Sequence, residues 1–175
     1  ELHPLNVLIG ANGVGKSNFI SLFKLINNII EQKLQLYISQ SGGIDSLLHF
    51  GRKTTSEIFV NLDFGENSYQ FTLVPTVDNT LVFSNEDCLF YFDSLNRDKI
   101  ANQVLLGVGH KETMIYNVNK PVVQYVKSDI TSWKVYHFHD TSDSSQMKQF
   151  GNINDNASLR PDASNLASYL FLLNK

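Results

Sequence analysis

The sequence predicts an α/β fold, and two changes in its hydrophobic pattern carry that prediction. A short apolar run at residues 5–9 leads into a glycine-rich turn at 10–15, and apolar residues at helical spacing follow over 16–37. The spacing then changes to every second residue across 57–92, as in an antiparallel sheet with one buried face. A strand, a turn, a helix and an antiparallel meander are therefore expected in that order.

The individual elements follow from local signals. Residues 5–9 predict a buried strand because they are apolar, few and followed by Gly10. Alternating residues at 57–64 and 69–74 flank a turn and predict a hairpin, and residues 81–92 continue the meander. The helix after the turn places one set of apolar side chains on a single face: Phe19, Ile20, Phe23, Ile26, Ile30 and Leu34.

The C-terminal part of the chain predicts two helices separated by a strand and a loop. Pro121 stands where the first turn of a helix tolerates proline, and the apolar residues after it share one helical face. Residues 134–138 predict a strand. A polar loop rich in Ser, Asp and Asn follows at 139–160, and Pro161 opens a final helix.

The composition describes a globular chain and argues against a broad nucleic-acid-binding face. The 175 residues include 42% hydrophobic side chains, enough for a core, and the formal net charge is -3. The single cysteine, Cys88, excludes a disulfide within the chain and favours the cytoplasm, and no apolar run is long enough to cross a membrane. The chain begins at Glu1 and a helical pattern still runs at its end, so we expect a piece of a longer protein.

Residues 10–17 carry the strongest chemical signal. They match G-x-x-x-x-G-K-[ST], the pattern of a P-loop, and they lie between a predicted strand and a predicted helix as that motif requires. The glycines let backbone N–H groups approach an anion, Lys16 reaches the outer phosphates of a nucleotide, and Ser17 is a ligand for Mg²⁺. The motif predicts a P-loop NTPase that binds Mg-ATP. The predicted nucleotide-binding residues are Asn12, Gly13, Val14, Gly15, Lys16, Ser17 and Asn18.

Two asparagines indicate which kind of P-loop protein the sequence resembles. With Asn12 and Asn18, residues 5–20 resemble the RecF/SMC/OLD branch of ABC-type ATPases. A second stretch at 133–142, with residues 154–167 after it, resembles a group of bacterial predicted ATPases in that branch. The resemblance implies an ABC-ATPase-like head lobe with a mixed sheet and an antiparallel β-subdomain.

The resemblance also implies how the chain is divided. Residues 1–175 would form the N-terminal part of one ABC-type domain, without its C-terminal lobe. The P-loop strand and helix would occupy 1–38, and the antiparallel β-subdomain about 56–92. The Q-loop region and the start of a helical lobe would occupy about 134–175.

An ATPase of this kind would complete its catalytic set outside these residues. Lys16 and Asp140 are the candidate catalytic residues. Asp140 falls near the Q-loop position, but this sequence lacks the glutamine that the family usually has there. The signature motif, the Asp-Glu pair and the switch histidine do not follow Asp140, so the resemblance places them beyond Lys175. Mg-ATP would bind between the heads of a homodimer, and hydrolysis would release them, in DNA repair or in defence against foreign DNA. The net charge gives no support for a DNA partner, and no membrane partner is expected.

Two other functions stay open. A self-contained kinase or GTPase would use Asp93, which follows the apolar residues 89–92, as a metal ligand. A non-enzymatic nucleotide switch would bind through the P-loop and change shape without hydrolysis. Selectivity for the nucleotide base distinguishes the kinase or GTPase from an ATPase. Nucleotide binding without hydrolysis in the full-length protein distinguishes the switch from an ATPase.

Three weaker patterns are interpreted as structural. Residues 41–45 resemble the ABC signature but precede the β-subdomain, so they predict a loop. Arg52 and Lys53 could contact phosphate or nucleic acid, although a solvated loop is favoured. His137 and His139, with the neighbouring acidic residue, are too few for a zinc site.

Overall fold

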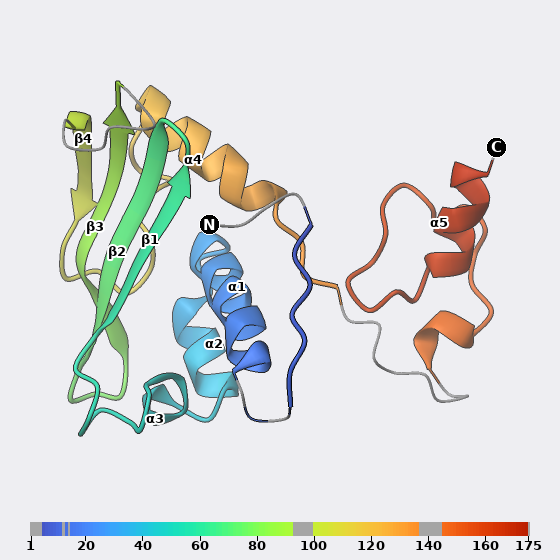
Figure 1. Ribbon diagram of the computed structural model, residues 1–175, viewed down its shortest axis with the longest axis horizontal. Coiled ribbons are helices and arrows are strands. Elements are labelled where there is room, and N and C mark those ends of the chain that lie inside the picture. Colours follow the sequence, from blue (N-terminus) through green and yellow to red (C-terminus); the bar gives the residue numbers. More distant parts are fainter. Residues whose placement is uncertain (1–4, 12, 14, 93–99, 137–144, 175) are drawn as a thin grey trace. The chain divides into compact units, whose positions relative to one another are not determined.

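The computed structural model describes residues 5–11, 13, 15–92, 100–136 and 145–174. The chain forms two compact units, Glu1–Trp133 and Lys134–Lys175. The first unit holds a four-stranded sheet and helices α1 to α4, and the second holds a short 3₁₀ helix, η1, and the helix α5 (Figure 1).

The sheet is an antiparallel meander, as the alternating pattern predicts. Its strands are β1 (Ile58–Phe64), β2 (Asn67–Pro75), β3 (Leu81–Tyr91) and β4 (Ile100–Gly107), and each pairs antiparallel with the next. Val60 pairs with Phe71, and Phe71 pairs with Glu86, so the three share the buried face. The register therefore carries a carboxylate into the interior, and β4 extends the sheet beyond residue 92, where the alternating pattern ends.

The helix predicted over 16–37 is interrupted. α1 (Lys16–Ile30) ends, and α2 (Leu34–Gln40) begins after Gln32, whose φ of 55° lies in the left-handed region. The prediction of one continuous helix is therefore wrong. The two remaining helices of this unit are α3 (Ile44–Leu47) and α4 (Pro121–Ser132).

A residue distant in sequence starts α2. The carboxylate of Glu112 accepts hydrogen bonds from the backbone N–H of Leu34 at 2.9 Å and of Gln35 at 3.0 Å. These N–H groups belong to the first turn of α2, where a helix has no partner of its own for them. The break between α1 and α2 thus depends on tertiary structure, and helical spacing cannot predict it.

The core fills the space between the sheet and three helices. Figure 1 shows α1, α2 and α4 on the same side of the sheet, and α4 contacts α1, β2 and β3. Pro121 occupies the start of α4, which confirms the prediction of a helix there. The fully buried side chains of this core include Ile26, Ile29, Tyr69, Phe71, Phe83, Val126 and Ile130.

Residues 5–9 belong to no strand, so the prediction of a buried strand is wrong. Leu5 is 81% exposed and Ile9 is 89% exposed. A strand needs a neighbour for its N–H and C=O groups, and the described residues form one sheet, which is antiparallel. The described residues therefore do not form the mixed sheet that was expected. Residues 134–136 also form no strand, and 137–138 lie outside the described residues.

The second unit is mostly loop, and the buried side chain of Asn165 organises it. Its amide donates to the carbonyl oxygens of Asp155 at 2.9 Å and Ser158 at 2.8 Å. The last helix begins after Asn165 rather than at Pro161 as predicted, because Ala163 has a left-handed φ of 59°. The regular elements are η1 (Gln146–Lys148) and α5 (Leu166–Leu173). Among the described residues, no helix is long and apolar enough to cross a membrane.

Candidate nucleotide-phosphate site

The turn before α1 depends on two glycines with left-handed backbone. The φ angle is 87° at Gly13 and 94° at Gly15, where an L-residue would be strained. Apart from the chain neighbours, no heavy atom of the described residues lies within 4 Å of the position that a Cβ would take at either glycine. Backbone conformation, rather than crowding, therefore explains the two glycines, and it directs the chain into α1 at Lys16.

The side chain of Lys16 folds back over this turn. Its Nζ atom donates to the carbonyl oxygens of Gly10 and Ala11, both at 2.6 Å. An ammonium group has three N–H donors, so one donor is left for an anion. The two carbonyl oxygens keep the ammonium group of Lys16 next to the turn, where the sequence motif predicts that phosphates bind.

The first turn of α1 adds positive potential at the same place. Its N–H groups have no acceptors within the helix, and the helix dipole is positive at this end. The preceding residue, Gly15, has no side chain to cap the helix, and no acidic residue lies in the first turn. An anion bound here would therefore not compete with a carboxylate of the helix itself.

Ser17 suits the role predicted for it as a Mg²⁺ ligand. Its side chain is exposed next to Lys16, and its hydroxyl makes no hydrogen bond within the described residues. Those residues contain no group of three or more His, Cys, Asp or Glu that could hold a metal ion. Mg²⁺ usually keeps several waters and takes one or two protein ligands plus phosphate oxygens. A single hydroxyl beside a phosphate site is therefore an adequate protein contribution.

A match to a known family agrees with the P-loop motif. Residues 5–172 match the family model described as "AAA domain, putative AbiEii toxin, Type IV TA system". The chain belongs to this AAA family. The AAA domain has the fold of P-loop NTPases, and such domains bind nucleotides and are typically ATPases. No curated protein and no solved structure matches the chain at a significant level.

The AAA domain brings part of the predicted site together. Gly13, Gly15, Lys16, Ser17 and Asn18 lie at the turn and at the start of α1. The other predicted nucleotide-binding residues, Asn12 and Val14, lie outside the described residues. The same holds for Asp140, for the alternative metal ligand Asp93, and for His137 and His139.

Two segments that the sequence predicts to be loops make hydrogen bonds within the first unit. Residues 41–43 join α2 to α3, and the N–H of Gly43 donates to the carbonyl oxygen of Ile38 at 2.9 Å. Ile44 and Asp45 belong to α3, so the prediction of a loop over 41–45 is wrong for these two residues. The guanidinium of Arg52 donates to the carboxylate of Asp45 at 3.1 Å and to Oδ1 of Asn79 at 2.5 Å. Its hydrogen bonds lower the pKa of Asp45. The hydrogen bonds of Arg52 thus connect α3 to the turn after β2.

A cleft of about 520 Å³ lies beside α1, and the sequence does not predict it. Its walls come from α1, α2, α3, His49 and the first residue of β1. We call it the α1 cleft, and its lining includes Asn18, Leu22, Leu25, Tyr37, His49 and Ile58. These residues come from separate segments with no common spacing, so no pattern in the sequence predicts the cleft.

Proposed function

We propose that this AAA domain binds Mg-ATP and serves as the nucleotide-binding lobe of an ATPase. The position of Lys16 carries the proposal. Its ammonium lies 2.6 Å from the carbonyl oxygens of Gly10 and Ala11 and retains one N–H donor for a phosphate. Membership of the AAA family supports the same function.

Each residue of the site has its own task in this proposal. Lys16 binds the outer phosphates, and the backbone N–H groups around Gly13 and Gly15 surround the inner ones. Ser17 and phosphate oxygens hold Mg²⁺, which neutralises phosphate charge when it is bound. Asn18 is exposed one position further along α1 and is available to contact the bound nucleotide.

Hydrolysis needs more than a phosphate site. A water molecule must be oriented and acidic groups must help to hold the metal ion. We propose that a further lobe supplies these groups, as in the RecF/SMC/OLD branch that the P-loop resembles. The exposed apolar residues 5–9 support this proposal, because such a segment is suited to join further strands. Binding of ATP would then drive dimerisation of two heads, in DNA repair or in defence against foreign DNA.

Thermal unfolding with Mg-ATP, with Mg-GTP and without nucleotide tests the proposal. ATP at about 100 times its Kd would add roughly 2.7 kcal/mol to the free energy of unfolding and raise the Tm clearly. The Lys16→Ala variant should lose this rise. Lys24→Ala, which removes another lysine of α1, should keep it. A rise with GTP alone would favour a GTPase, and no rise with either nucleotide in folded protein would contradict nucleotide binding.

A further inference from the structure

The α1 cleft is lined by a residue adjacent to the proposed phosphate site. Asn18 follows Ser17 directly, and it lines the cleft together with Ser21, Leu22 and Leu25. Residues at this spacing share one face of a helix. A helix rises about 1.5 Å per residue, so this face runs roughly 10 Å away from the phosphate site. A nucleotide whose phosphates bind at the start of α1 therefore has its nucleoside within reach of the cleft.

The lining of the cleft combines an apolar wall with polar groups that can make further hydrogen bonds. Leu22 and Leu25 of α1 and Ile58 of β1 provide apolar surface. Within the described residues, no hydrogen bond engages the hydroxyl of Tyr37 or the imidazole nitrogens of His49. Ligand sites typically have this character, with mostly apolar walls and a few polar groups that orient the ligand. A flat heteroaromatic ring with polar edges fits such a lining.

The loop that carries His49 is held in a strained conformation. Phe50 has a left-handed φ of 58°, which is unfavourable for a bulky residue, and its ring packs 4.2 Å from the His49 ring, centroid to centroid. The Thr55 hydroxyl donates to the carbonyl oxygen of His49 at 2.6 Å. The Arg52 backbone N–H donates to Asp45 at 2.9 Å. Such strain persists only where surrounding contacts enforce it, and it is common at functional sites.

We propose that the α1 cleft binds the nucleoside part of the nucleotide, with His49 as the residue that recognises it. The imidazole ring of His49, which contacts the Phe50 ring at an interplanar angle of 64°, offers a face for the base to stack on. Asn18 and Tyr37 offer hydrogen-bonding groups to the polar edge of the base or to the ribose. The inference rests on the proposed function, because it requires the phosphates at the start of α1.

Calorimetric titration of the chain with Mg-ATP and with magnesium tripolyphosphate, which lacks a nucleoside, tests the inference. Wild type should bind ATP at least roughly tenfold more tightly than tripolyphosphate. His49→Ala removes the stacking face, and Ser21→Trp fills the cleft from an exposed position of α1. Both should bring the affinity for ATP close to that for tripolyphosphate and leave tripolyphosphate binding unchanged. Ile20→Trp, exposed on α1 outside the cleft, should behave like wild type.

The outcomes separate the inference from the proposed function. If wild type binds both probes equally, or if neither cleft variant changes their affinity ratio, the nucleoside lies elsewhere. The inference is then overturned while phosphate binding stands. If folded wild type binds neither probe, the proposed function fails and the inference fails with it. Near-ultraviolet circular dichroism identifies a misfolded Ser21→Trp, and His49→Ala then decides the question, because it removes an exposed side chain.

Discussion

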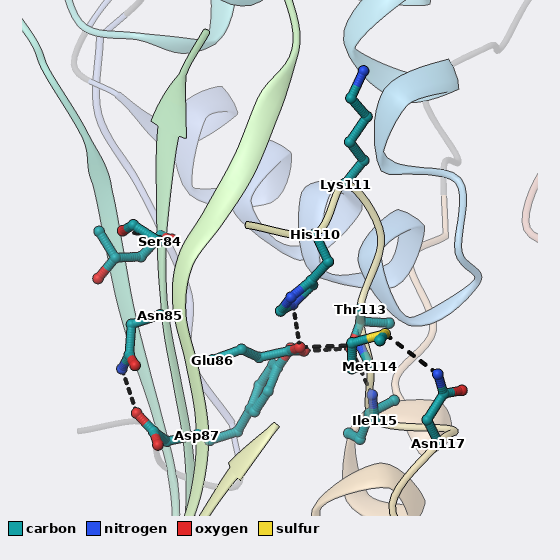
Figure 2. A network of polar contacts seen from close by, with 12 residues as sticks. Ser84, Asn85, Glu86, Asp87, His110, Lys111, Thr113, Met114, Ile115 and Asn117 are labelled. Carbon is teal, nitrogen blue, oxygen red and sulfur yellow. Dashed lines mark hydrogen bonds and ion pairs between the residues drawn. The ribbon is translucent and has the colours of Figure 1, made fainter. Parts of the chain in front are cut away.

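The Nε2 atom of His110 lies 2.8 Å from Oε2 of Glu86 in the interior of the first unit (Figure 2). Glu86 is fully buried, and it also accepts hydrogen bonds from the Tyr69 hydroxyl at 2.5 Å and the Met114 N–H at 3.0 Å. The hydroxyl of Thr113 donates to the same carboxylate. One buried carboxylate thus fastens the segment after β4 onto β3. Glu112, the residue that caps α2, lies in that segment.

Replacement of Glu86 should destabilise the protein strongly. Glu86→Ala leaves the buried donors around it without their acceptor, so we expect a loss of about 3–5 kcal/mol in the free energy of unfolding. Urea denaturation measures this loss. Glu57→Ala removes an exposed carboxylate just before β1 and should change stability by no more than about 0.5 kcal/mol. Similar small losses in both variants would show that the network does not anchor the segment.

Removal of the α2 cap should have a smaller and more local effect. Glu112→Ala takes away the acceptor for the N–H groups of Leu34 and Gln35, so we expect a loss of about 1 kcal/mol and faster amide exchange at both residues. Glu31→Ala is the control, because its ion pair with Lys33 is exposed and contributes little. Unchanged exchange at Leu34 and Gln35 in Glu112→Ala would mean that something else starts α2.

Alkaline conditions should weaken the fold through Cys88. Burial raises the pKa of its thiol from 9.0 to about 12, and the charges of Glu86 and Asp87 act in the same direction. The unfolded thiol loses its proton first, so this contribution to stability is complete below pH 9.0 and is lost as the pH rises to about 12. The loss is at most about 1.4 kcal/mol per pH unit.

Cys88→Ala should therefore show a shallower decline of stability over that interval. Urea denaturation of both proteins at several alkaline pH values measures the two slopes. Burial also raises the pKa of Tyr69, which is present in both proteins, and the charge of Cys88 is the smallest cause of that shift, so most of the Tyr69 effect cancels. Identical slopes would show that the buried thiol does not carry this pH dependence.

The features that the sequence predicts correctly depend on residues that are close together along the chain. Gly13, Gly15 and Lys16 act within one turn, so their spacing alone predicts the turn and the start of α1. The meander was also predictable, because alternation records which side of a strand is buried. The break before α2 was not, because its cap, Glu112, is 78 positions away from Leu34.

The remaining differences have the same physical origin. An apolar run such as residues 5–9 predicts a strand, but a strand forms only where another strand supplies hydrogen bonds. The α1 cleft joins Asn18, Tyr37, His49 and Ile58, and only the packed structure brings these residues together. The sequence therefore predicts the phosphate site and leaves its surroundings undetermined.

Calorimetric titration of Mg-ATP into wild type, Lys16→Ala and Lys24→Ala tests the central claim most directly. If the ammonium of Lys16 binds phosphate, wild type and Lys24→Ala bind ATP with equal affinity, and Lys16→Ala binds at least roughly tenfold more weakly, a difference of about 1.4 kcal/mol. Equal affinity in Lys16→Ala, or no binding to folded wild type, would contradict the assignment of this turn as a nucleotide-phosphate site.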